Sequence, residues 1–170
     1  DTKLIDIKEI ESFCPVWLAP NSSQEVVTIG IVFKGGGDII SPNKPSVPGL
    51  LASMMYEGTS DLDHIAFKRL LISKKINLYA YATKDDFFLI IKTLKININT
   101  AFSILKAVMF DLRLDPCDFE RVKAQSYASF SQMQHYPNNI ALEDFSKTAF
   151  GKDHPYSKTA KDSAKSVIDS

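Results

Sequence analysis

The residue types that could hold a metal ion or activate a nucleophile are few and widely separated in this chain. The histidines are His64, His135 and His154, and none is followed at i+3 or i+4 by a second histidine, a cysteine or an acid, the spacing of a metal pair on a helix. Ser53 and Ser126 lie in no G-x-S-x-G elbow, and no histidine–acid pair stands out to activate either hydroxyl. The pattern indicates surface or hydrogen-bonding histidines and argues against serine catalysis.

A glycine string, Lys34–Asp38, could in principle cradle a phosphate through its backbone amides. It has neither the G-x-G-x-x-G spacing nor a G-K-[ST] ending, and it leads into Pro42, Pro45 and Pro48 rather than a helix. The string is therefore interpreted as a connection between a strand and a helix.

Adjacent acids are the remaining candidates for proton transfer. Asp85 and Asp86 fall in an expected hairpin turn, and Asp61 and Asp63 fall at the positive N-terminal end of an expected helix. Both places favour solvated carboxylates for structural reasons, so no acid–base pair is predicted here.

The composition of the 170 residues is that of a soluble globular domain, with 45% hydrophobic and 24% charged residues. Twenty basic residues balance twenty acidic ones, so no net field would attract nucleic acid. The aromatic residues of 79–88 accompany no basic RNA-binding string and are expected to pack within a sheet. No apolar run reaches the ~20 residues of a membrane span, so no membrane insertion is expected. Cys14 and Cys117 are predicted to be structural thiols, with a single bridge as the alternative.

Alternating apolar residues predict a strand at 26–33, and the preceding strand 16–19 and turn 20–23 predict an opening hairpin with it. Two helices should follow, at 50–56 and 64–74, and then a hairpin of 78–82 with 87–91. Later helices are expected from 99 to about 113, from Asp115-Pro116 through Phe130, and from an Asn138 cap to Gly151. The order ββααββααα predicts an α+β fold in which a layer of helices covers one face of an antiparallel-rich sheet.

Five stretches, taken in order, resemble the pitrilysin/insulinase-type peptidases, the inverted zincins. They look like that family's first hairpin with its glycine loop, the metal helix that closes in Gly-Thr, a following strand pair, a D-P-x-x-F-E-R-x-x-x-Q helix of non-catalytic relatives, and a G-x-x-H-P-Y turn. The stretches are Val16–Asp38, Pro48–Thr59, Asn77–Phe88, Leu114–Gln125 and Phe150–Tyr156. The resemblance spans nearly the whole chain and implies the same α+β fold.

The chain departs from that family at the metal motif. Counting back from Gly58-Thr59, the H-x-x-E-H positions carry Gly49, Ala52 and Ser53, with Leu50 and Leu51 between them. Glycine and alanine side chains offer zinc no lone pair, and segment 125–130, which corresponds to the third ligand, has no carboxylate. The resemblance therefore implies a non-catalytic homologue with no zinc of its own. The freed helix should bury Leu50, Leu51, Met54 and Met55 as a structural wall.

The resemblance also implies an N-terminal domain, residues 1–170, of a longer protein with two similar domains, truncated before its last elements. A zinc-bearing homologous subunit would be the partner, and together the two would enclose a peptide chamber. Extended peptides could add to an edge strand over Leu78, Tyr79, Ala80, Tyr81 and Ala82. Relatives occur in bacterial envelopes and in mitochondria, and the envelope is the favoured expectation. The alternatives are a structural assembly protein derived from the peptidase fold and an active peptidase with unrecognised ligands.

Overall fold

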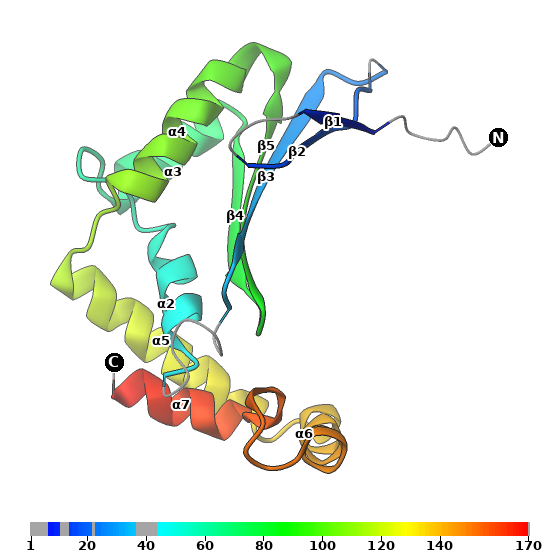
Figure 1. Ribbon diagram of the computed structural model, residues 1–170. Helices are drawn as coiled ribbons and strands as arrows, with labels where there is room; N and C mark the ends of the chain where they lie inside the picture. The colour runs from blue at the N-terminus through cyan, green and yellow to red at the C-terminus, as the bar shows by residue number, and fades with distance from the viewer. Residues whose placement is uncertain (1–6, 11–13, 22, 37–43, 170) are drawn as a thin grey trace.

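A three-stranded antiparallel sheet forms the centre of the computed structural model, which describes residues 7–10, 14–21, 23–36 and 44–169 (Figure 1). Strands β3 (Val26–Lys34), β5 (Asp86–Leu94) and β4 (Asn77–Ala82) lie side by side in that order. The predicted hairpin is confirmed, since Leu78 pairs with Ile91 and Ala82 with Phe87. This order leaves β4 at one edge of the sheet.

Three helices cover one face of this sheet: α2 (Val47–Met54), α3 (His64–Ser73) and α4 (Ile98–Phe110), which follows the short helix η1 (Lys95–Asn97). Alternate strand residues enter the core with them, because successive side chains of a strand point to opposite faces. The buried cluster includes Leu89 and Ile91 from β5 and Phe67 from α3. On the opposite face Tyr79 and Tyr81 are half exposed. The α+β prediction, with helices on one face, is confirmed.

A second group of helices extends beyond the end of the sheet: α5 (Pro116–Met133), α6 (Pro137–Phe150), η2 (Pro155–Ser157) and α7 (Ala160–Ile168). The Asp115 carboxylate accepts hydrogen bonds from the amides of Cys117 and Asp118 and so caps α5, as the sequence predicts. Helix α7 begins in a capping box between Thr159 and Asp162.

The predicted opening hairpin is wrong. Strand β2 (Val16–Leu18) pairs with β1 (Lys8–Ile10) in a separate two-stranded sheet, whereas β3 pairs along its whole length with β5. The nine residues of β3 are matched in length by the nine of β5, whereas β2 has only three residues, as many as its partner β1. The element order therefore gains β1 at its start and α7 at its end.

Smaller differences have local causes. Tyr136, not Asn138, occupies the N-cap of α6, because Pro137 already takes the first helical position. Helix α4 ends at Phe110 rather than near Arg113. Leu51 is 42% exposed although it was expected to be buried. The end of the glycine string, Gly37-Asp38, and Ser22 of the predicted first turn lie outside the described residues.

None of the helices in the described ranges is both long enough and apolar enough to cross a membrane.

Candidate functional site

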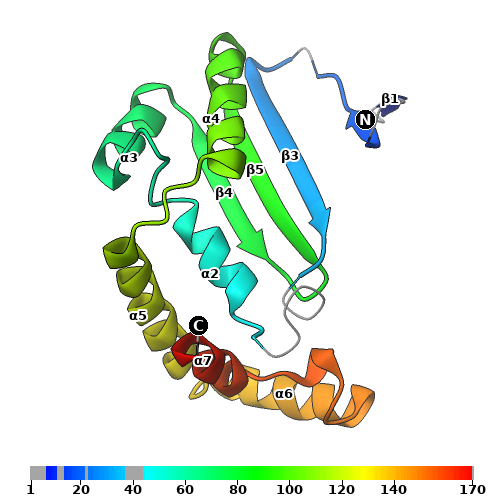
Figure 2. The same ribbon diagram turned by 60° about the vertical axis from the view of Figure 1, so that its left-hand side comes forward.

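The H-x-x-E-H positions lie on α2, which packs between β4 and α5 (Figure 2). Pro48 stands in the first helical turn, where a missing N–H removes no helical hydrogen bond. Before the helix, the Ser46 hydroxyl meets the Ser166 hydroxyl of α7 at 2.7 Å, which ties the two elements together. At the far end, Gly58 has φ +121 and an added Cβ would lie 2.2 Å from the Leu62 carbonyl oxygen, so the Gly-Thr closure requires glycine there.

Each motif position has a different environment. At Gly49 a Cβ would meet nothing within 4 Å, so this position borders open space. Ala52 is 3% exposed and belongs to the main core. The Ser53 hydroxyl donates a hydrogen bond of 3.0 Å to the Gly49 carbonyl oxygen one turn earlier. These side chains amount to a hydrogen, a buried methyl and a hydroxyl turned to its own helix.

Zinc does not fit this set. Two of the three side chains have no donor atom, and the third is engaged with the helix backbone. On α5, the region of the family's third ligand carries Gln125 and Ser126 and no carboxylate. The contact between the two helices is apolar and is made by Leu50, Met54 and Val122. Within the ranges that the structure describes, no group of three or more histidines, cysteines and acids lies close enough to hold a metal ion.

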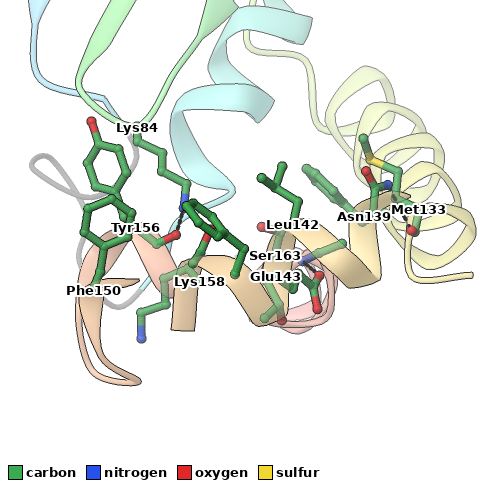
Figure 3. A pocket seen from close by; sticks show the side chains of 14 residues that line it. Lys84, Met133, Asn139, Leu142, Glu143, Phe150, Tyr156, Lys158 and Ser163 are labelled. Atoms are coloured by element: carbon green, nitrogen blue, oxygen red, sulfur yellow. Dashed lines mark hydrogen bonds between the residues drawn. The ribbon is translucent and has the colours of Figure 1, made fainter. Parts of the chain in front are cut away.

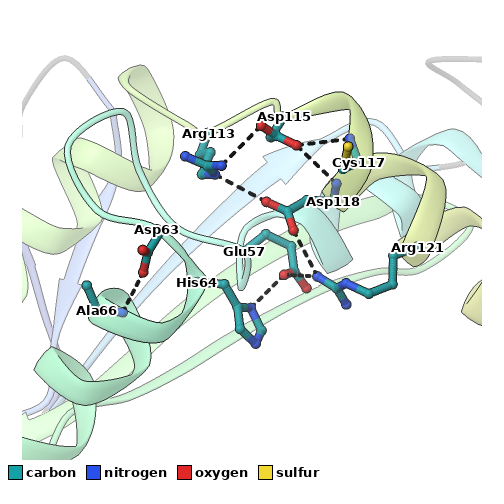
Figure 4. A network of polar contacts seen from close by, with 9 residues as sticks. All are labelled: Glu57, Asp63, His64, Ala66, Arg113, Asp115, Cys117, Asp118 and Arg121. Carbon is teal, nitrogen blue, oxygen red and sulfur yellow. Dashed lines mark hydrogen bonds and ion pairs between the residues drawn. The ribbon is translucent and has the colours of Figure 1, made fainter.

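A polar cluster that the sequence did not predict lies just beyond α2 (Figure 4). Glu57 is 5% exposed, and its Oε2 accepts a hydrogen bond from Arg121 Nη2 of α5. His64 Nδ1, at the start of α3, lies 2.6 Å from the same oxygen, but not in hydrogen-bond alignment. Buried carboxylates are costly unless they are paired, and here the Arg121 guanidinium supplies the pairing.

The cluster continues along the first turn of α5 through Asp118. Its Oδ1 accepts from Arg121 at 3.3 Å and its Oδ2 from Arg113 Nε at 3.2 Å. The Arg113 hydrogen bond is the main cause that lowers the pKa of Asp118 below its ordinary value, and Arg121 adds to it against the effect of desolvation. Arg113 also pairs with Asp115 at 3.1 Å.

This cluster joins the end of α2, the start of α3 and the start of α5. Its carboxylates already form ion pairs with guanidinium groups. The arrangement therefore fits a structural role, in which it holds the three helices together, better than an acid–base site. The sequence signal was present in Glu57, just before Gly-Thr, and in Arg121, inside the D-P-x-x-F-E-R string. The two residues are 64 positions apart in the chain, and only the fold brings them together.

The other predicted candidates are not brought together. His135 is exposed in the turn between α5 and α6, and His154 Nδ1 accepts a hydrogen bond of 3.1 Å from the Tyr156 amide. Asp63 caps α3 through the Ala66 amide at 2.8 Å, as expected of an acid at a helix N-terminus.

Two more predictions concern the hairpin turn and the cysteines. Asp86 pairs with Lys34 at 3.1 Å beside the turn, and Tyr156 donates a hydrogen bond to Asp85. An added Cβ on Gly36 would lie 2.2 Å from the Thr83 carbonyl oxygen, so the start of the glycine string packs against this turn. Cys117 is an exposed free thiol, so the alternative of a single bridge between the two cysteines is wrong.

The predicted peptide-binding strand, Leu78–Ala82, belongs to β4 and lies at the sheet edge in the part of the chain that is described. Leu78 and Ala80 point into the core, and Tyr79 and Tyr81 point to the open face, where Tyr81 stacks on Phe88 with ring centroids 4.8 Å apart. Tyr56, just after α2, reaches this edge. Its hydroxyl lies 2.6 Å from the Ala80 amide nitrogen and 3.3 Å from the Ala80 carbonyl oxygen.

A separate apolar hollow of about 500 Å³ lies among α5, α6, η2 and α7 (Figure 3). Phe130, Leu142 and Phe145 are among its lining residues, and none of the motif positions on α2 is. At one end Lys84 donates a hydrogen bond to the Tyr156 carbonyl oxygen. Phe145 and Leu142 are 64% and 62% exposed, so this hollow is continuous with an apolar surface on α6.

Comparison with known proteins places these features in a family. Residues 16–163 match the family described as insulinase (peptidase family M16). A Helicobacter pylori protein named "Non-peptidase homolog YmxG" is 28% identical over 120 residues, which cover 71% of this chain and 28% of that protein.

Two solved structures share the fold. A peptidase M16 inactive domain from Pseudomonas fluorescens superposes with a TM-score of 0.82 at 19% identity, over 96% of this chain and 40% of the other. A Helicobacter pylori structure described as a protease gives a TM-score of 0.83 at 17% identity, over 98% of this chain and 41% of the other. The chain thus spans well under half the length of each of these relatives.

Proposed function

The chain belongs to the insulinase family of peptidases, peptidase family M16, on the non-catalytic branch that lacks H-x-x-E-H, and from this premise we propose that it is the non-catalytic partner of a zinc-bearing homologue. In that role it forms part of the wall of a peptide-enclosing chamber. The partner supplies the metal, the activated water and the general base.

The environment of α2 is the observation that carries this proposal. Ala52, at the position of the family's general base, is packed in the core, and Leu50 and Met54 join α2 to α5 through Val122. Burial of side chains of the size of Leu50 and Met54 contributes about 1.5–3 kcal/mol each to the free energy of folding. The helix that holds zinc in active relatives therefore acts in this chain as a packing element.

Exposed apolar side chains support the existence of a partner. Helix α6 presents Ile140, Leu142 and Phe145 at 48%, 62% and 64% exposure, and the β1–β2 ribbon presents Trp17 at 69%. A lone two-stranded ribbon is marginally stable in water, and contiguous exposed apolar residues typically mark protein contacts. A homologous chain is the partner that the family relationship favours.

The proposal is tested by isolating the full-length protein from its native host and identifying what accompanies it. We expect a homologue with an intact H-x-x-E-H motif, zinc in proportion to that homologue alone, and peptide hydrolysis by the mixture. Zinc that is bound by the purified chain, together with unaided hydrolysis, would overturn the proposal.

Matched variants separate assembly from chemistry. Ser53→Ala in this chain should leave hydrolysis by the mixture unchanged, whereas Glu→Gln in the partner's H-x-x-E-H motif should abolish it. Phe145→Ser on α6 should weaken co-elution of the two chains. Asp144→Ser, one residue away on the same exposed helix, should not.

A structural assembly protein is the second candidate, and one observation favours it. The centre of the β4 edge is already hydrogen-bonded to Tyr56, so nothing on this strand requires a peptide. Co-purification with a membrane complex in the absence of a peptidase homologue would select this function over the first.

A further inference from the structure

The edge of β4 that faces away from β5 is occupied at its middle by a side chain from just beyond the end of α2. In an antiparallel pair, the N–H and C=O of alternate residues point toward and away from the neighbouring strand. Tyr56 reaches both backbone groups of Ala80, so these two groups point away from β5. By alternation, the backbone groups of Leu78 and Ala82 also point outward, while Tyr79 and Tyr81 pair with β5.

A peptide strand that adds to β4 would pair with these outward groups. One pairing residue would accept from the Ala80 amide and donate to the Ala80 carbonyl. The Tyr56 hydroxyl does both, since it accepts from the amide at 2.6 Å and donates to the carbonyl at 3.3 Å. It therefore takes the place of one residue of an incoming strand.

We propose that Tyr56 closes the β4 edge, so that this chain does not take extended peptides by strand addition until the Tyr56 side chain is displaced. Leu78 and Ala82 lie on either side of the closed position, about 13–14 Å apart. Each offers an isolated pair of backbone groups, and a continuous ladder cannot form between them. A peptide would also have to replace two hydrogen bonds that the chain already makes, which cancels most of its gain.

This inference deepens the proposed function and rests on it for its biological role, because it assigns peptide pairing to the zinc-bearing partner. The test uses the full chain without that partner. A failure of the two chains to assemble therefore leaves this test unaffected, and a failure here leaves assembly unaffected.

The first measurement is amide hydrogen exchange at Ala80, followed by NMR in the isotope-labelled chain. Tyr56→Phe removes only the hydroxyl and should accelerate Ala80 exchange roughly tenfold. Tyr81→Phe makes the same chemical change on β4 itself, at a half-exposed ring on the open face, and should leave Ala80 unchanged. Unchanged exchange in Tyr56→Phe would show that the hydroxyl does not hold this edge.

The second measurement is binding of a short fluorescein-labelled peptide of alternating valine and threonine with a lysine at each end. We expect no saturable binding to the wild-type chain and measurable binding to Tyr56→Ala, with shifts at the Leu78 and Ala82 amides. Saturable binding to the wild-type chain that shifts the Ala80 amide would overturn the proposal. If Tyr56→Ala fails to fold, the exchange comparison with Tyr56→Phe still decides the matter.

Discussion

Replacement of Ala52 by glutamate restores the family's general-base residue at its own position and tests whether packing has closed that position. Ala52 is 3% exposed and lies in the same buried cluster as Phe67 and Leu89. The new side chain adds a methylene and a carboxyl group to a core that has no opening for them. We expect Ala52→Glu to destabilise the chain severely.

Two contributions give the magnitude. Added atoms in a packed core cost about 1–3 kcal/mol through strained rotamers and backbone shifts. Full burial can raise the pKa of a carboxyl group by about 3 units or more. A rise of 3 units corresponds to a loss of about 4 kcal/mol in the free energy of unfolding once the group is ionised. The sum of about 5–7 kcal/mol is comparable with the whole stability of a typical domain, about 5–15 kcal/mol.

Urea unfolding followed by far-ultraviolet circular dichroism measures this loss. Because the introduced carboxyl has a raised pKa in the folded state, its charge penalty is full near neutral pH and disappears below about pH 4, the unfolded value. Ala52→Gln keeps the size without the charge and should lose only the pH-independent part. Ser53→Glu places the same carboxylate one residue along, at a half-buried position, and should change stability by less than about 1 kcal/mol.

An Ala52→Glu chain whose free energy of unfolding lies within about 1 kcal/mol of the wild type at neutral pH would show that packing has not closed this position. Equal damage from Ser53→Glu would also contradict closure at one position, because α2 would then be intolerant of any carboxylate.

Three further predictions concern the same helices. Gly49→Ala should raise the free energy of unfolding by about 0.5–1 kcal/mol, because the added Cβ enters open space and glycine is a poor helix former. Thermal unfolding measures this change, and a loss of stability would contradict the open environment of Gly49. Asp115→Ala should lower the free energy of unfolding by about 1 kcal/mol, because the Cys117 and Asp118 amides lose their cap. Thermal unfolding measures this loss, and unchanged stability would argue against capping. The lowered pKa of Asp118 means that its ionised form stabilises the fold above about pH 4 and that this stabilisation is lost as the pH falls through its folded-state pKa. The stability gap between wild type and Asp118→Asn should therefore narrow in acid urea titrations, and a gap independent of pH would contradict the Arg113 pairing.

Local signals predicted the elements that local physics determines. The hairpin of β4 and β5 follows from two alternating runs around a polar turn, and α5 follows from Asp115-Pro116. The motif positions followed from counting back from Gly58-Thr59, and the structure places all three on one helix. These features depend on residues that are close together in the chain.

The features that the sequence did not predict depend on residues far apart in the chain. Strand β2 has only three residues, so its alternation could not show whether its partner was β1 or β3. The pairing of Glu57 with Arg121 joins residues that are 64 positions apart, and the Tyr56 contact with Ala80 spans 24. Such contacts are set by the packing of α2 against its neighbours, and no local pattern encodes them.

This chain differs from an active peptidase at three places, and each difference has its own physical cause. No single substitution would therefore reverse all three. A ligand side chain at Gly49 would enter open space, so this position lacks a zinc ligand without being blocked. Ala52 is different, because the core now fills the place that a general base would need. The β4 edge is held by a third contact, the Tyr56 hydroxyl, which is independent of both. Under the proposed function, metal binding, base catalysis and peptide pairing would therefore be lost for unrelated reasons, and recovery of one would leave the other two lost.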